Sequence, residues 1–255
     1  MIISHKYKYI FVGLPLAAST AISKELCEQY EGKPILAKHS IYQDFLKIAT
    51  EEEKKYSVIA CARNPLDISV SYYTKMINDI SGNFSNKRLL RKNGGHLKMR
   101  DYKLSRYLRD NNTTYEDFLR RYYLFPFDNW LSITAPYCGF IIRFENLQED
   151  FEKALKYCNI SPKRKLPIIN KTKKKVGFES FYNEKNSELS LSIFGPYMLK
   201  HGMAFPEIWK EKRVSSLSLL LFKLFGFIRK IYWTKKSYRN TKAQKVYKNL
   251  IEKHQ

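Results

Sequence analysis

The sequence predicts an α/β domain of three layers, in which helices cover a central parallel sheet. Apolar runs rich in β-branched residues alternate with segments of helical periodicity, as expected for parallel strands joined by helices. The chain is also long and apolar enough for one sizeable core, because 44% of its 255 residues are hydrophobic. A disordered protein is therefore excluded.

The predicted elements follow one another in regular order. Strands are expected at residues 9–13, 34–38, 56–62 and 139–144, and each is followed by a helix, at residues 18–30, 42–54, 66–79 and 148–158. A further helix is expected at residues 113–124, with Thr113 or Thr114 as its N-cap. Residues 80–112 carry turn residues and many bases, which indicates an insertion or lid.

The composition is strongly basic. Lys and Arg number 46 against 24 Asp and Glu, and the resulting formal net charge of +22 suggests an anionic partner. Residues 85–110 and 163–175 each have a net charge of +7, and residues 210–255 have +11. These segments are either solvated loops and a tail or the rim of an anion site. Their charge also allows a nucleic-acid-binding protein, which we treat as the weaker alternative.

The N-terminal segment allows two interpretations. Lys6 and Lys8 before an apolar run fit a short secretory signal, but Pro15 interrupts the run and an amphipathic pattern continues to Cys27. A buried strand, a tight turn and a helix are therefore favoured, and we expect a cytoplasmic protein. The four cysteines are isolated, so we expect reduced thiols and no zinc site.

The turn after the first predicted strand is a candidate anion site. A strand that turns directly into a helix aims free backbone N–H groups at a ligand. The small side chains in this turn allow close approach, and its hydroxyls add donors. The segment lacks the G-x-x-x-x-G-K-[ST] pattern, which disfavours a P-loop nucleotide kinase. The candidate binding residues are Leu16, Ala17, Ala18, Ser19 and Thr20.

A second candidate anion site follows the strand at residues 56–62. Arg63 comes directly after the strand, Asn64 can cap the next helix, and Pro65 suits its first position. Ser71 lies about two turns along this helix and can face the same side as Arg63. A guanidinium and a hydroxyl that converge in this way suit a terminal phosphate. Pairing of Arg63 with Asp67 is the alternative.

These motifs resemble a known family. The spacing Arg63-Asn-Pro-x-Asp-x-x-x-Ser71 is similar to the 3′-phosphate motif of sulfotransferases that use 3′-phosphoadenosine 5′-phosphosulfate (PAPS). The turn from Pro15 to Thr20 resembles that family's 5′-phosphosulfate loop. The resemblance covers about residues 8–209, densely at these two motifs and loosely after them. It implies a fold like that of the P-loop NTPases, PAPS as co-substrate without a metal, and sulfuryl transfer to a hydroxyl of a carbohydrate or glycolipid.

One position departs from the family pattern. The family usually has Lys or Arg directly after the proline of the first loop, where this chain has Leu16. Lys38 and Lys171 are our candidates to replace that cation. If neither does so, the chain is a catalytically weak member of the family.

His39 is the candidate catalytic base. It follows the second predicted strand, at the same sheet edge as the first loop, and a histidine can accept a proton near neutral pH. The Lys38-His39 pair is similar to the catalytic region of many family members. The alternative is that His39 caps the helix that is expected to start near Ser40.

We expect two parts along the chain. Residues 1–209 would form the sulfotransferase-like domain, with residues 80–112 as its basic insertion, and residues 210–255 would form a basic amphipathic tail. Residues 217–233 are apolar and aromatic with bases at the edges. Residues 217–253 could therefore lie on the anionic inner face of a membrane. Alternatively, this helix docks on the domain or on another subunit.

Overall fold

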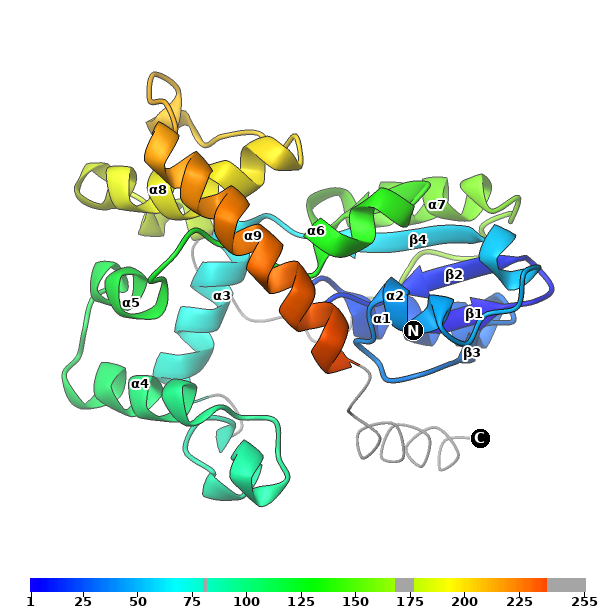
Figure 1. Cartoon of the computed structure of the whole chain (residues 1–255), viewed down its shortest axis with the longest axis horizontal. Helices are drawn as coiled ribbons and strands as arrows, with labels where there is room; N and C mark the ends of the chain where they lie inside the picture. Colours follow the sequence, from blue (N-terminus) through cyan, green and yellow to red (C-terminus); the bar gives the residue numbers. More distant parts are fainter. Residues whose placement is uncertain (80–81, 168–176, 238–255) are drawn as a thin grey trace. The chain divides into compact units, whose positions relative to one another are not determined.

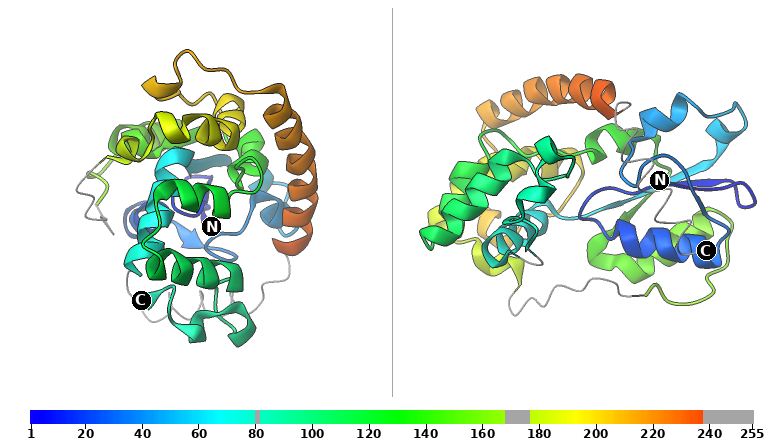
Figure 2. Two further views of the ribbon diagram at one scale, coloured as in Figure 1. Left: turned by 90° about the vertical axis from the view of Figure 1, so that its left-hand side faces the viewer. Right: turned by 90° about the horizontal axis from the view of Figure 1, so that it is seen from below.

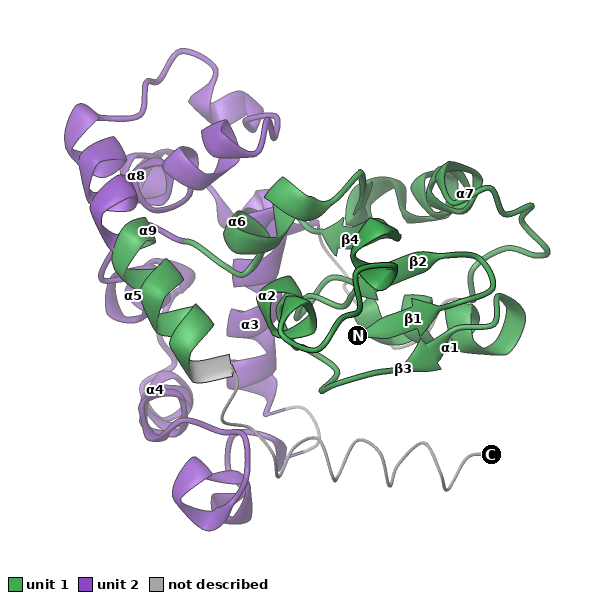
Figure 3. Cartoon of the chain, turned by 45° about the vertical axis from the view of Figure 1, so that its right-hand side comes forward, with its two compact units in different colours: residues 1–63, 128–173, 226–255 green, residues 64–127, 174–225 purple. Residues whose placement is uncertain are grey.

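A computed structural model describes residues 1–79, 82–167 and 177–237. The chain divides into two compact units (Figures 1 and 3). Unit 1 contains the sheet and consists of residues 1–63, 128–173 and 226–255, and unit 2 is helical and consists of residues 64–127 and 174–225. Among the described residues, no helix has both the length and the apolarity that crossing a membrane requires.

Unit 1 is built on a mixed sheet of five strands. Its order is β3-β1-β2-β4-β5, and β2, β4 and β5 run parallel, with Phe11 opposite Ile59 and Ile59 opposite Phe140. Every residue of β2 is buried, as its unbroken apolar sequence predicts. The strands are β1 (Ile2–Ser4), β2 (Tyr9–Val12), β3 (Lys33–Pro34), β4 (Ser57–Ala62) and β5 (Phe140–Arg143).

The prediction of a wholly parallel sheet is wrong at one edge. Strand β1 was not predicted; it pairs antiparallel with β2 and β3, and its Ile3 lies opposite both Ile10 and Lys33. A short turn at residues 5–8, with Lys8 at φ 50°, joins β1 to β2 as a hairpin. The strand predicted at residues 34–38 is also wrong beyond Pro34, because Leu36 adopts a left-handed backbone with φ 57° that an extended strand excludes.

The helices of unit 1 lie on both sides of the sheet in the right-hand view of Figure 2, with α1 and α7 on the same side. The predicted helices at residues 18–30 and 148–158 are confirmed as α1 and α7. The prediction for residues 42–54 is wrong in its second half, because Thr50 and Glu53 exchange side-chain to backbone hydrogen bonds that start a new turn. The elements are α1 (Ser19–Gln29), α2 (Tyr42–Leu46), η1 (Glu53–Lys55), α6 (Leu131–Thr134), η5 (Ala135–Tyr137), η6 (Phe144–Asn146) and α7 (Leu147–Tyr157).

Unit 2 consists of helices and short 3-10 turns. Asn64 caps α3 with Pro65 in its first turn, and Thr114 caps α5 in a reciprocal capping box, so both predicted N-termini are confirmed. The elements are α3 (Pro65–Asn78), η3 (Lys87–Leu89), η4 (Arg91–Asn93), α4 (Met99–Asp110), α5 (Tyr115–Tyr122), η7 (Phe178–Phe181), α8 (Glu184–Lys200) and η8 (Glu207–Trp209). Helix α9 (Ser216–Ser237) begins in unit 2 and ends in unit 1.

The described part of the basic segment, residues 82–112, is packed into unit 2. Its apolar side chains Phe84, Leu90, Leu97 and Leu108 are buried in the same cluster as Phe194 of α8. The apolar side chains of this segment therefore form part of the core of unit 2, and its basic side chains lie at the surface.

Candidate functional site

The loop between β2 and α1 has an unusual backbone. Leu16 and Ala18 adopt left-handed conformations, with φ 65° and 49°, although neither is a glycine. Such conformations are strained and concentrate at functional sites. Ala18 is the N-cap of α1, and its methyl side chain cannot accept a hydrogen bond from the helix. Helices α2, α4, α6 and α7 also lack a side-chain cap, whereas α3, α5 and α8 have one. The first N–H groups of α1 therefore have no side-chain acceptor at the cap and are available to an anion.

A glycine brings a second segment against this loop. A Cβ atom at Gly13 would lie 3.1 Å from the carbonyl oxygen of Lys38 and 3.2 Å from the Cβ of Ser19. Such contacts are tighter than most Cβ contacts, so a side chain at this position would push the two neighbours apart by a few tenths of an ångström. Gly13 was not among the predicted site residues. A glycine directly after a buried strand was the available signal.

Lys38 lies at the N-terminus of α1. Its Nζ donates a hydrogen bond of 2.7 Å to Thr20 Oγ1. The N-terminal amine of Met1 donates to the carbonyl oxygens of Ala37 and Lys38, at 3.1 and 3.3 Å, and so holds this segment in place. Burial lowers the pKa of Lys38 from its usual value. The predicted cation and the predicted loop are therefore together in one site.

His39 is oriented by the backbone carbonyl of Gly13, the residue that follows β2. Its Nδ1 lies 2.7 Å from the carbonyl oxygen of Gly13. A carbonyl oxygen only accepts, so Nδ1 carries the proton and Nε2 carries a lone pair. Burial lowers the pKa of His39 below its usual 6.5, which favours the neutral ring. The alternative interpretation of His39 as a helix cap is wrong, because α2 starts at Tyr42 with Ile41 as its N-cap and no side-chain cap.

Arg63 joins the end of β4 to the first loop. Its Nη1 donates a hydrogen bond of 3.0 Å to the carbonyl oxygen of Leu16, and its guanidinium lies 4.3 Å from the ring centroid of Phe144. Arg63 and Lys38 thus bring positive charge to the two ends of the segment Leu16–Thr20. The contact between Arg63 and Phe144 was not predicted, since nothing in the sequence shows which aromatic ring will lie beneath an arginine.

The remaining predicted site residues are placed as follows. Ala17 is buried in the loop, Ser19 is buried at the start of α1, and Thr20 is exposed. Ser71 is buried in α3, which belongs to unit 2, so its convergence with Arg63 stays a prediction. Lys171 lies outside the described residues.

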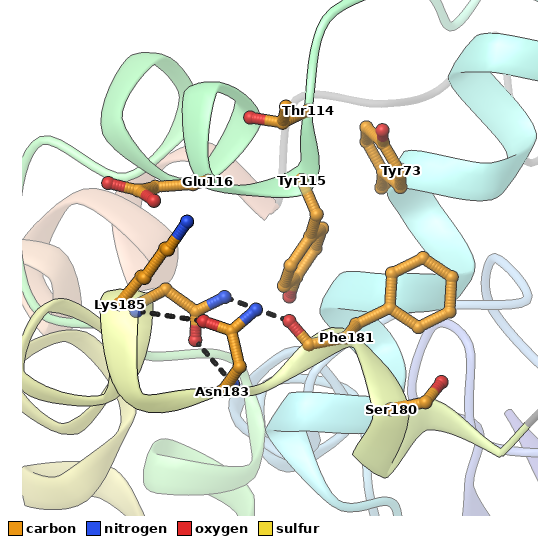
Figure 4. A pocket seen from close by; sticks show the side chains of 9 residues that line it. Tyr73, Thr114, Tyr115, Glu116, Ser180, Phe181, Asn183 and Lys185 are labelled. Carbon is orange, nitrogen blue, oxygen red and sulfur yellow. Dashed lines mark hydrogen bonds between the residues drawn. The ribbon is translucent and has the colours of Figure 1, made fainter.

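Unit 2 contains a cavity of about 470 Å³ where α5 and α8 begin (Figure 4). Its wall includes the aromatic rings of Tyr73 and Phe181 and the charged side chains of Glu116 and Lys185. None of the site residues predicted above lines it. In the part of the chain that the structure describes, no three His, Cys, Asp or Glu side chains are grouped as a metal site would require.

Comparison with known proteins gives one result. A family model described as "Sulfotransferase domain" matches residues 4–189, which is well over half of the chain. The match includes the loop at residues 14–20, the Lys38-His39 pair, Arg63 and Ser71. Searches of curated proteins and of solved structures found no significant match.

Proposed function

This chain belongs to the sulfotransferase domain family, and on that basis we propose that it transfers a sulfuryl group from PAPS to a hydroxyl of a carbohydrate or glycolipid. The donor follows from the resemblance of the two anion motifs to the family's 5′-phosphosulfate and 3′-phosphate motifs. The acceptor class is the one that the same resemblance implies. A P-loop-like arrangement of the three layers is part of the same proposal.

The observation that carries the proposal is the N-terminus of α1, which has no side-chain cap and has Lys38 and Arg63 beside it. PAPS is an anion at both ends, and its phosphosulfate needs N–H donors, hydroxyls and a cation. The loop can supply the backbone N–H groups, Thr20 a hydroxyl, and Lys38 the cation. These residues therefore fit the phosphosulfate group.

We assign to Lys38 the charge that Leu16 does not supply. Negative charge develops on the leaving phosphate as the sulfur–oxygen bond breaks, and a fixed cation stabilises that charge. Lys38 reaches the first turn of α1 from the segment after β3, whereas the family's usual base reaches it from the loop itself. We therefore propose that Lys38 provides the cation that the family usually has at the position of Leu16.

His39 is the base in this proposal. The acceptor oxygen attacks sulfur and forms a new sulfur–oxygen bond, the bond from sulfur to the phosphate oxygen breaks, and adenosine 3′,5′-bisphosphate leaves. Nε2 of His39 takes the proton of the attacking hydroxyl. The hydrogen bond from Nδ1 to Gly13 keeps the lone pair of the neutral ring on Nε2 until that atom takes the proton.

A comparison of cell extracts tests the activity and identifies the acceptor. Glycans and glycolipids from cells with and without the protein are compared by mass spectrometry, and a product heavier by one sulfate is expected only with the wild-type chain. Cells that carry His39→Ala serve as the control, because they make the same protein without its base. If all three samples contain the same sulfated species, this acceptor assignment is wrong.

A further inference from the structure

A row of exposed apolar side chains runs along α9. They recur every three or four residues, so they share one face of the helix. Each is between 41% and 66% exposed, which is unusual for side chains of this size. We call this row the α9 stripe, and it consists of Leu217, Leu220, Leu224, Phe227, Ile228, Ile231 and Tyr232.

The opposite face of α9 is the one that packs on the protein. Phe222 is only 7% exposed and lies beneath the ammonium of Lys200, and Phe225 packs on Phe125 with ring centroids 4.1 Å apart. Farther along, Arg229 pairs with the buried Asp128. These contacts fix the rotation of the helix about its axis. The α9 stripe is therefore directed to solvent by the packing of the rest of the helix.

Positive charge lies beside and beyond the α9 stripe. Lys223 and Lys230 are exposed, and because they are seven residues apart they lie on the same flank of the helix. Residues 212–251 contain eleven Lys and Arg and no Asp or Glu. An apolar face with a basic flank is the pattern of a helix that binds at the surface of an anionic bilayer.

We propose that the α9 stripe docks on an anionic lipid bilayer, with α9 parallel to the membrane plane. The stripe would enter the boundary between headgroups and acyl chains, and Lys223 and Lys230 would contact lipid phosphates. Lys223, Arg229 and Lys230 lie within the apolar run, which favours an in-plane helix over a crossing one. A second copy of this chain is disfavoured as the occupant, since it would bring an equally basic segment against the first.

Vesicle binding by the full chain tests this proposal. Co-sedimentation is measured with vesicles of phosphatidylglycerol and phosphatidylcholine and with vesicles of phosphatidylcholine alone. Leu220→Glu with Leu224→Glu changes the stripe, and Ile48→Glu with Leu199→Glu is the matched control, because it adds the same charge at two exposed apolar side chains elsewhere. Circular dichroism verifies that both variants fold.

The proposal expects binding to the anionic vesicles and weak binding to the neutral ones. The stripe variant should lose more than about tenfold in affinity, and the control less than about threefold. Lys223→Gln with Lys230→Gln should lose about fivefold for each lysine removed. Equal losses in the stripe variant and the control would overturn the proposal. So would a wild-type dimer in light scattering that the stripe variant dissociates, because the stripe would then be occupied by a second copy.

Discussion

The ammonium group of Lys38 donates a hydrogen bond of 2.7 Å to the hydroxyl of Thr20, in the first turn of α1. The two residues are 18 positions apart in the chain and are brought together by the close approach at Gly13. A cation is therefore present at a loop that has Leu16 where the family usually has Lys or Arg. This contact is the structural reason to expect an active enzyme.

Removal of the Lys38 charge should reduce the rate of the chemical step. We expect Lys38→Met to lower kcat by about 10²- to 10³-fold, as for loss of one group that stabilises developing negative charge. Steady-state kinetics with PAPS measure the change. Lys24→Met removes a lysine from the surface of the same helix, where it pairs with Glu28, and should have little effect.

Restoring a base at the family's usual position should rescue that variant. Leu16→Lys added to Lys38→Met is expected to recover at least about tenfold of the lost kcat, because an ammonium would again reach the leaving phosphate. A full kcat in Lys38→Met alone would show that the rate does not depend on this cation.

The fall of kcat/KM at acidic pH should report the protonation of His39. Its folded pKa is below 6.5 because of burial, and it acts as a base only when neutral. The midpoint of the fall in kcat/KM toward acidic pH should therefore lie below pH 6.5. His39→Ala should lower kcat by about 10²- to 10⁴-fold and abolish this fall. If the fall is unchanged in His39→Ala, another group is the base.

The same pKa has a consequence for stability. At pH values between the folded pKa of His39 and 6.5, the unfolded chain binds more protons at His39 than the folded chain does. The free energy of unfolding therefore falls as the pH falls through this range. Urea unfolding of wild type and His39→Ala at several pH values measures the difference. The variant should lose less stability than wild type over the same interval.

Gly13→Ala should damage both stability and activity. The added Cβ would press on the Lys38 carbonyl and on Ser19, and overpacking of this kind costs about 1–3 kcal/mol of the free energy of unfolding. Gly226→Ala is the matched control, because its Cβ would meet nothing nearer than 3.9 Å and alanine favours a helix. Urea unfolding distinguishes the two. A Gly13→Ala protein as stable and active as wild type would contradict the tight approach.

Local sequence signals predicted the parts of the fold that short-range chemistry determines. Asn64 and Pro65 predicted where α3 begins, and Thr114 predicted the start of α5. The apolar runs predicted β2, β4 and β5, and burial is most complete in β2 and in β4, which has a parallel neighbour on each side. For the site, Lys38, His39 and the first loop were selected from their place after strands, and the structure brings them together.

Other features depend on contacts between distant parts of the chain. The pairing of β1 with two strands could not be predicted, since three residues give no periodicity to distinguish a strand from a terminus. The predicted second strand ends early because the backbone of Leu36 is left-handed. Leucine rarely adopts this conformation, so the residue type did not predict it. The stacking of Arg63 on Phe144 joins residues that follow different strands, and only the register of β4 and β5 brings them together.

Binding of adenosine 3′,5′-bisphosphate tests the central claim most directly. Isothermal titration of the purified wild-type chain should give saturable binding, and Arg63→Ala should weaken it by about 10- to 100-fold, as for loss of hydrogen bonds to a charged group. Arg106→Ala removes an exposed arginine that pairs with Asp110 on α4, and it should bind as wild type does. Absence of saturable binding by the wild-type chain, or equal affinity of wild type and Arg63→Ala, would contradict the account.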